Sequence, residues 1–263
     1  MGIDLTKVKT YSIKQRFSKV DKGAFAKAGK RGDNFSAFYR SLPNILKAKD
    51  FRSVVEAIIT AKKKGKPVIF MMGAHVIKCG LSPLIIDLIQ RKILTTIAFN
   101  GAGIIHDFEI AYQGKTSEDV AKALKDGSFG MGKETAEFLN SAVNEGIQHG
   151  LGIGKSVGGA IAKENLKYRE YSILYHCYKE NISACVQVAI GTDIIHQHPS
   201  FSGAAAGCGS QRDFLALVEA ITKLGNGGVV LNFGSNVILP EVFLKALNLA
   251  LNLGHKVYYF TAS

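Results

Sequence analysis

Short apolar runs alternate with amphipathic stretches along most of the chain, and this alternation predicts strands connected by helices. Residues 68–72 and 95–99 are apolar runs of strand length, and a glycine-bearing turn follows each of them. Between the two runs, Ser82 can cap a helix, Pro83 suits its first turn, and the leucines and isoleucines that follow form an apolar stripe. The order strand, helix, strand, helix predicts the α/β class.

The same alternation continues toward the carboxyl end. We expect further strands at 184–190, within 227–236 and at 256–260, and a small-residue loop at 201–210. The expected helices are 50–65, 104–112, 134–148, 167–178, 213–224 and 240–253. These elements predict a Rossmann-like parallel sheet with helices on both faces. We expect residues 49–263 to form this α/β domain and residues 1–48 to form an N-terminal basic arm.

Polar turns follow the predicted strands, and the first two carry small residues: Gly73, Ala74 and His75, and then Asn100, Gly101, Ala102 and Gly103. In a parallel sheet such turns gather at one edge, where ligands usually bind. Glycine allows a ligand to approach the backbone, and a helix beginning there offers free N–H groups to an anion. A tight connection would also select glycine. Because GxGxxG and GxxxxGK[ST] are absent, both interpretations stay open.

A polar cluster, GTDIIHQHPS, follows the strand expected at 184–190. Its Asp193, His196 and His198 could bind a metal, share protons near neutral pH or contact a ligand. Asp193 could also cap a helix, with the histidines filling the wall of a crevice. No third metal ligand has suitable spacing, and the four cysteines form no zinc-type cluster. We therefore predict ligand contact and no metal.

Composition narrows the class of protein. A hydrophobic content of 47% with 21% charged residues is typical of a globular protein. No apolar run reaches membrane-spanning length, so we expect a soluble cytoplasmic protein without a membrane partner. The net charge of +12 raises the possibility of nucleic-acid binding. Many basic residues lie within the first 66 positions, where a solvated arm and a helix end explain them, and no nucleic-acid-binding motif is present.

The order of these motifs resembles the deoxyhypusine synthase family over most of residues 66–263. GAHVIKCG resembles that family's TSNLISSG, and FNGAGIIHDFE is similar to its TTAGGVEEDLI. AIGTDIIHQHPS falls where the family has ALTDGSLGD, while GGVVLNFGS and YYFTA match its late glycine turn and NTA tip. The family binds NAD in a parallel-sheet domain, oxidises spermidine and passes an aminobutyl group through a lysine to a protein acceptor.

The resemblance implies NAD contacts at positions that match the family's motifs: Ala74, His75, Asn100, Gly101, Ala102, His106, Asp193, Gly234, Ser235, Thr261 and Ala262. The turn residues Gly73 and Gly103 join this set. The IHDFE turn also looks like the turn of NAD-dependent ornithine cyclodeaminase domains, which adds Asp107. A tetramer with active sites at subunit boundaries is likewise implied by resemblance only.

The positions that match the family's substrate-binding residues differ from the family pattern. Leu239 and Phe243 replace its polyamine-contacting histidine and asparagine, and its tryptophan and lysine loop lies beyond the point where this sequence stops. We predict a deoxyhypusine synthase-like NAD-dependent enzyme that oxidises an amine-bearing substrate, a polyamine such as spermidine. His196 or His198 would accept a proton, and Glu241 would pair with a cationic substrate. The alternatives are an ornithine cyclodeaminase-like enzyme acting on a small amino acid and a non-catalytic NAD-binding member.

Overall fold

The computed structural model describes residues 2–263 and divides the chain into two compact units, Met1–Val55 and Glu56–Ser263. The first unit contains η1 (Leu5–Lys7), η2 (Ile13–Gln15), η3 (Lys22–Ala24) and α1 (Phe35–Ser41). Most of its large apolar side chains are exposed to solvent, and none of its described residues is fully buried; Phe17 retains 87% of its accessible surface. The segment that includes these short helices therefore has no core of its own. Within residues 2–263, none of the helices combines the length and the hydropathy that crossing a membrane requires.

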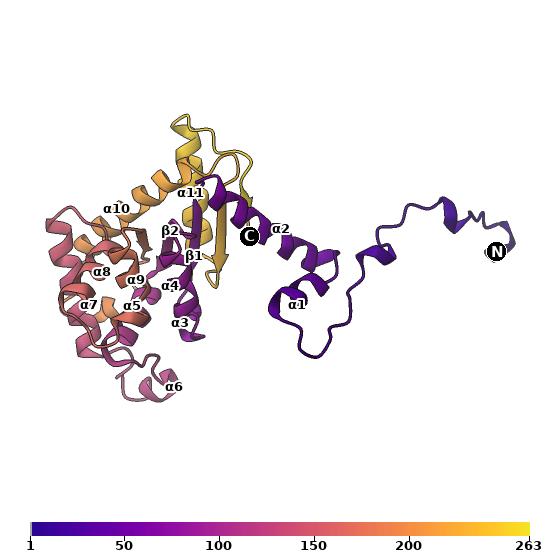
Figure 1. The fold of residues 1–263 in the computed structure, drawn as a ribbon. Coiled ribbons are helices and arrows are strands. Elements are labelled where there is room, and N and C mark those ends of the chain that lie inside the picture. Colours follow the sequence, from indigo (N-terminus) through magenta and orange to yellow (C-terminus); the bar gives the residue numbers. More distant parts are fainter. Residues whose placement is uncertain (1) are drawn as a thin grey trace. The chain divides into compact units, whose positions relative to one another are not determined.

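The second unit contains a five-stranded sheet in which all pairings are parallel. The strands are β1 (Val68–Met72), β2 (Thr96–Asn100), β3 (Ser183–Gln187), β4 (Val229–Phe233) and β5 (Thr261–Ala262), in the spatial order β3-β2-β1-β4-β5 (Figure 1). The fold is therefore α/β and Rossmann-like, as the alternating pattern predicts. The order reverses between β1 and β4, because the chain builds outward through β2 and β3 before it returns to the other side of β1.

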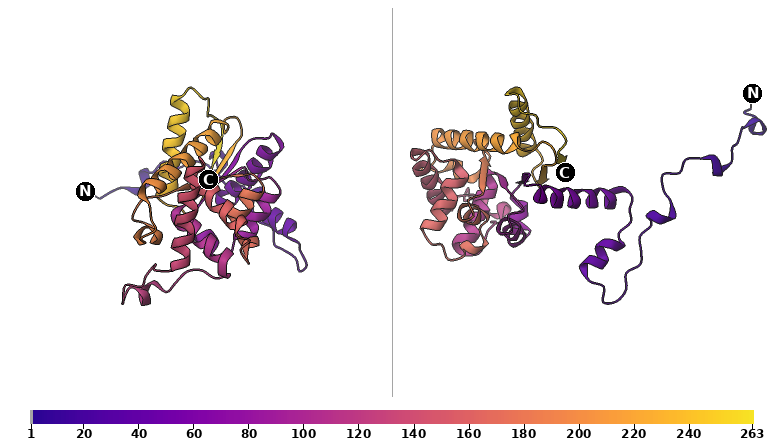
Figure 2. Two further views of the ribbon diagram at one scale, coloured as in Figure 1. Left: turned by 90° about the vertical axis from the view of Figure 1, so that its left-hand side faces the viewer. Right: turned by 45° about the horizontal axis from the view of Figure 1, so that its top comes forward.

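Helices cover both faces of this sheet (Figure 2). Ile69 and Met71 of β1 pack in one core with α10 (Gly203–Thr222) and α11 (Ile238–Asn252). Val68, Phe70 and Met72 alternate to the opposite face and are also buried. The remaining helices are α2 (Leu46–Lys63), α3 (His75–Lys78), α4 (Ser82–Gln90), α5 (Gly101–Gln113), α6 (Val120–Ala123), α7 (Lys133–Gln148), α8 (Ile153–Lys163), η4 (Arg169–Tyr171), α9 (Ile173–Lys179) and η5 (Ile194–Gln197).

Two elements differ in kind from the sequence prediction, and others differ in their bounds, such as the helix expected at 167–178, which begins as α9 only at Ile173. The loop expected at 201–210 is wrong, because Ser202 caps Ala205 and the small residues that follow form the first turns of α10. Alanine favours a helix, and the cap supplies the acceptor that the first turn lacks. The strand expected at 256–260 is also wrong. Tyr259 adopts a left-handed φ of 58°, which interrupts an extended chain, and pairing with β4 begins only at Thr261.

The edge strand β3 is protected by its neighbours. The carboxylate of Asp213 on α10 accepts the N–H of Val186 at 2.8 Å and the N–H of Gly154 at 3.0 Å. Ser210, one turn earlier on α10, donates to the carbonyl of Val186 and accepts from Val188. These contacts satisfy backbone groups that an edge strand would otherwise expose. They also fix the start of the loop that carries Asp193.

Candidate functional site

The turns singled out in the sequence lie at the carboxyl ends of neighbouring parallel strands. β1 leads into Gly73, β2 into Gly101, β3 into the loop that carries Asp193, and β4 into Gly234. The reversal of strand order between β1 and β4 is the place where open parallel sheets bind ligands. The sequence therefore located the edge of the sheet correctly, and the four turns share it.

Gly73 and Gly234 touch across this reversal point. The N–H of Gly73 donates to the carbonyl of Phe233 at 2.9 Å, and a Cβ on Gly73 would lie only 2.1 Å from the carbonyl oxygen of Gly234. Gly234 has a φ of 72°, in the left-handed region that favours glycine. Contact between the two turns therefore requires both glycines, whether or not a ligand binds there.

The first turn of α5 forms the next part of the edge. The helix begins at Gly101, three residues earlier than predicted, because the side chain of Asn100 caps the N–H of Gly103 at 3.1 Å. The N–H group of Ala102, in the first turn, has no acceptor within the helix. That of Gly101 faces Gln187 in the pairing of β2 with β3. A Cβ on Gly101 would lie 1.9 Å from Oδ2 of Asp193, so that carboxylate lies directly beside the helix start.

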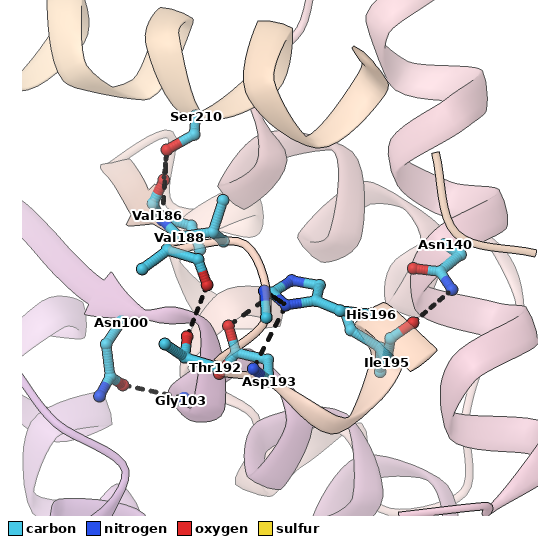
Figure 3. A network of polar contacts seen from close by, with 12 residues as sticks. Asn100, Gly103, Asn140, Val186, Val188, Thr192, Asp193, Ile195, His196 and Ser210 are labelled. Atoms are coloured by element: carbon cyan, nitrogen blue, oxygen red, sulfur yellow. Dashed lines mark hydrogen bonds and ion pairs between the residues drawn. The ribbon is translucent and has the colours of Figure 1, made fainter. Parts of the chain in front are cut away.

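Asp193 carries the clearest sign of an incomplete polar site. Its side chain is only 6% exposed, and Oδ2 has no hydrogen-bond partner among the described residues. Figure 3 shows the side chain beside the ring of His196, with which it forms a longer ion-pair contact. Burial raises the pKa of this carboxyl to about 6. A buried acceptor without a donor costs free energy, so the position suits a ligand that donates a hydrogen bond, such as a hydroxyl or an ammonium group.

His196 and His198 lie on the same loop but use ring nitrogens within the protein. Nδ1 of His196 accepts the N–H groups of Gly191 at 3.0 Å and Asp193 at 3.3 Å. Its proton therefore lies on Nε2, which is 3.7 Å from Oδ2 of Asp193. Nε2 of His198 donates to the carbonyl of Gly130 at 2.8 Å. His196 in this geometry orders the loop, and the role of either histidine as proton acceptor stays a prediction.

Two residues counted among the cofactor contacts lie near α3. His75 is exposed at the first position of α3, and its helix follows the β1 turn directly. Nδ1 of His106 lies 2.6 Å from the hydroxyl of Thr116, which donates to Glu109. Burial lowers the pKa of His106, so its ring is neutral near neutral pH. The glutamate of the resembled family is thus replaced by a neutral, hydrogen-bonded imidazole.

The structure places Asp107 away from the edge. The residue is completely buried, and its carboxylate accepts from the Ser172 hydroxyl at 2.5 Å and from the N–H groups of Ile173 at 2.7 Å and Leu174 at 3.2 Å. It therefore caps the start of α9 in the interior. Its inclusion among the cofactor contacts is corrected here, because every direction toward a ligand is closed by protein.

Thr261 and Ala262 also lie away from the other turns. The register pairs Thr261 with Val229 and Ala262 with Val230, at the beginning of β4. The end of β4 is Phe233, so at about 3.3 Å per residue these two positions lie roughly 10 Å or more below the edge. The cofactor contact of this pair stays a prediction that needs a ligand reaching that far from the edge. Ser235, in contrast, follows β4 at the edge and is buried.

Glu241 lies in the first turn of α11, beside a groove that the sequence did not predict. The groove, about 520 Å³ in volume, lies between α10 and α11 and includes the buried Gln187 at the end of β3. Glu241 is exposed and pairs with Lys245 one turn later. A larger hollow of about 780 Å³, lined by residues of α7 and α8, contains none of the predicted site residues. Gln187 is a candidate site residue only because its side-chain amide is buried without a hydrogen-bond partner. The sequence alone does not show this feature.

No family model matches the chain, and no curated protein matches its sequence. Solved structures resemble it at low identity. A conserved candidate LOR/SDH protein from Methanococcus maripaludis S2 is 16% identical, with a TM-score of 0.49 over 97% of this chain and 63% of that one. AgrE in its ternary complex with ornithine and NAD+ is 15% identical, with a TM-score of 0.46 over 79% of this chain and 26% of that one.

A candidate deoxyhypusine synthase from Entamoeba histolytica is 12% identical, with a TM-score of 0.45 over 86% of this chain and 96% of that one. This chain spans less than two thirds of the length of the first two structures. At these identities and TM-scores the likeness says nothing about the reaction of this chain. Its class as a Rossmann-like α/β protein follows from its own sheet.

Proposed function

We propose that the chain is an NAD-binding enzyme that oxidises a carbon bearing an amine. The observation that supports this proposal most directly is the buried, unpartnered Oδ2 of Asp193, held beside the first turn of α5. The position lies at the carboxyl edge of a parallel sheet whose strand order reverses between β1 and β4, the usual place for a dinucleotide.

The donor and acceptor groups at this edge fit NAD. The backbone N–H of Ala74 has no acceptor among residues 2–263, and that of Ala102 has none within its helix. Both would bind pyrophosphate oxygens. Asp193 would accept a hydrogen bond from a ribose hydroxyl, as an acidic residue does in dinucleotide sites. Its negative charge also keeps phosphate oxygens away from its own side of α5. The phosphates would therefore lie toward the β1 turn and the ribose toward the β3 loop.

The bound nicotinamide would supply the chemistry by accepting a hydride from the substrate. The chain must hold the amine and remove its proton, because a protonated amine cannot release a hydride from the adjacent carbon. Because the ribose would engage Asp193, His196 or His198 would accept that proton, and His196 also orders the loop through the N–H groups of Gly191 and Asp193. Glu241 offers a carboxylate for a cationic substrate.

The finer reaction rests on the sequence resemblance. A polyamine substrate with aminobutyl transfer, and a homotetramer, follow from likeness to the deoxyhypusine synthase motifs. A small amino acid follows from likeness to the ornithine cyclodeaminase turn. Because the engaged Nδ1 of His196 leaves fewer open bases than such a reaction needs, a non-catalytic NAD-binding protein is the second candidate function.

A titration with NAD tests the first step. We expect the melting temperature to rise with NAD concentration, since a ligand that binds the native state stabilises it. Asp193→Ala should lower the NAD affinity obtained from this titration at least tenfold. No change at millimolar NAD would overturn the proposal. NADH absorbance during incubation with NAD and a panel of amines then separates an enzyme from a binding protein. NAD binding without NADH formation would favour the second candidate.

A further inference from the structure

The groove between α10 and α11 forms a site of its own at the carboxyl edge of the sheet. Its volume is about 520 Å³, and β3 ends in it at Gln187. Its walls include Phe214 of α10 and Val242 of α11, and its rim includes Glu241 and Lys245. The groove therefore combines an apolar wall, a buried amide and a pair of opposite charges.

Gln187 is the part of this groove that most clearly indicates a ligand. The residue is 5% exposed, and its Nε2 is out of reach of solvent with no hydrogen-bond partner among residues 2–263. A buried amide without a partner costs about 1–3 kcal/mol, and a leucine of similar size would avoid that cost. Rotation of this amide about its terminal bond exchanges Nε2 with Oε1 and can turn the donor toward the groove that the residue lines. The observation then points to a ligand oxygen that accepts from this amide.

The two charges on the rim specify the ligand further. Glu241 and Lys245 lie one turn apart on α11, and both side chains are more than half exposed. Such a surface pair contributes about 0–1 kcal/mol, so a ligand that satisfies both charges can open it at little cost. One carboxylate and one ammonium group complement a zwitterion. A polyamine, which carries only positive charges, would gain one partner and be repelled by the other.

We propose that this groove binds a free α-amino acid. Its α-carboxylate would accept from Lys245 and the Gln187 amide, its α-ammonium would donate to Glu241, and its side chain would lie along Phe214 and Val242. The proposal deepens the proposed function, on which it rests for the reaction, by making the amine-bearing substrate an amino acid. Binding in the groove can be measured whether or not NAD binds.

Matched ligand pairs test the zwitterion. Calorimetric titrations of the full chain would compare L-ornithine with putrescine, and L-leucine with 3-methylbutylamine; each amine is its partner without the carboxylate. We expect at least one amino acid to bind at least tenfold more tightly than its amine. Equal or tighter binding of both amines, or of spermidine, would overturn the proposal, and so would no binding of either amino acid at 10 mM.

Matched variants test the place of binding. Lys245→Met should weaken amino-acid binding at least tenfold, whereas Lys223→Met should not, because Lys223 forms an equivalent exposed pair with Glu219 at 2.9 Å outside the groove. Gln187→Leu should also weaken binding while the protein keeps or gains stability, which a purely structural glutamine would not allow. Unchanged binding in both groove variants would overturn the proposed site.

The NAD titration keeps the two proposals apart. Amino-acid binding that depends on Lys245, in a protein that does not bind NAD, would support the proposed amino-acid site and contradict the proposed NAD-dependent function. NAD binding, with NADH formed from polyamines but not from amino acids, would support the NAD-dependent function and contradict the groove as its substrate site.

Discussion

The carboxylate of Asp193 occupies the space into which a side chain on Gly101 would extend. A Cβ built on Gly101 lies 1.9 Å from Oδ2 and 2.6 Å from Cγ of Asp193, so the two residues cannot both carry a side chain in this arrangement. Glycine at the start of α5 therefore positions a buried carboxylate. A role in admitting a ligand directly to the helix N-terminus is secondary to that contact.

This contact predicts strong coupling between the two positions. Gly101→Ala should lower the free energy of unfolding by about 1–3 kcal/mol, the usual cost of overpacking a buried site. In an Asp193→Ala background the same substitution should cost at least 1 kcal/mol less, because the clashing carboxylate is gone. Urea denaturation of the four proteins measures the coupling. Additive effects would mean that the two side-chain positions do not meet in solution.

A second glycine contact involves backbone that cannot rotate away. Gly73→Ala would place a methyl group 2.1 Å from the carbonyl of Gly234, and we expect a loss of about 1–3 kcal/mol together with at least tenfold weaker NAD binding. Gly203→Ala is the matched control. Its Cβ would meet only side-chain atoms at 3.9 Å, so stability should change by no more than about 1 kcal/mol and NAD binding not at all. Normal NAD affinity in Gly73→Ala would separate this turn from the cofactor site.

The sequence predicted the features that depend on local periodicity and turn chemistry. The runs at 68–72 and 95–99 and the glycine turns that follow them placed the carboxyl edge correctly. Features that depend on contacts between residues far apart in the sequence were not predicted. Asp107 follows a suggestive turn but points inward to α9, and β5 pairs at a level that the chain pattern does not fix. Gln187 can be identified as a candidate ligand-binding residue only from the structure, where α10 and α11 line the groove beside it and supply no hydrogen-bond partner for Nε2.

The interior position of Asp107 predicts a purely structural phenotype. Asp107→Ala removes the acceptor for the Ser172 hydroxyl and for the N–H groups of Ile173 and Leu174, so we expect a loss of about 2–4 kcal/mol of stability. NAD affinity of the folded variant should remain within twofold of the original. Isothermal titration at a temperature well below the melting point checks this. A tenfold weaker affinity would return Asp107 to the cofactor site.

Asp213 predicts how stability depends on pH. Burial raises the pKa of this carboxyl in the folded protein to about 7, above its usual 3.8. The native state then holds the proton more tightly than the unfolded chain, so the stabilisation is fully present below pH 4 and is lost as the pH rises from 4 to 7. The loss amounts to a few kcal/mol, since one pKa unit corresponds to about 1.4 kcal/mol.

Substitution of Asp213 tests this pH dependence, because Asp107 and Asp193, each with a pKa raised to about 6, add slopes of the same sign. Asp213→Asn can still offer an oxygen to the N–H groups of Val186 and Gly154, and it should flatten the decline in stability between pH 4 and 7. Asp213→Ala should flatten it too, while lowering stability by about 2–4 kcal/mol at pH 4, because two buried donors lose their acceptor. Its deficit relative to the original protein should shrink as the pH rises to 7, since only the original protein loses the stabilisation from the protonated carboxyl. Denaturant midpoints at several pH values compare the three proteins. An unchanged slope in both variants would show that Asp213 does not titrate between pH 4 and 7.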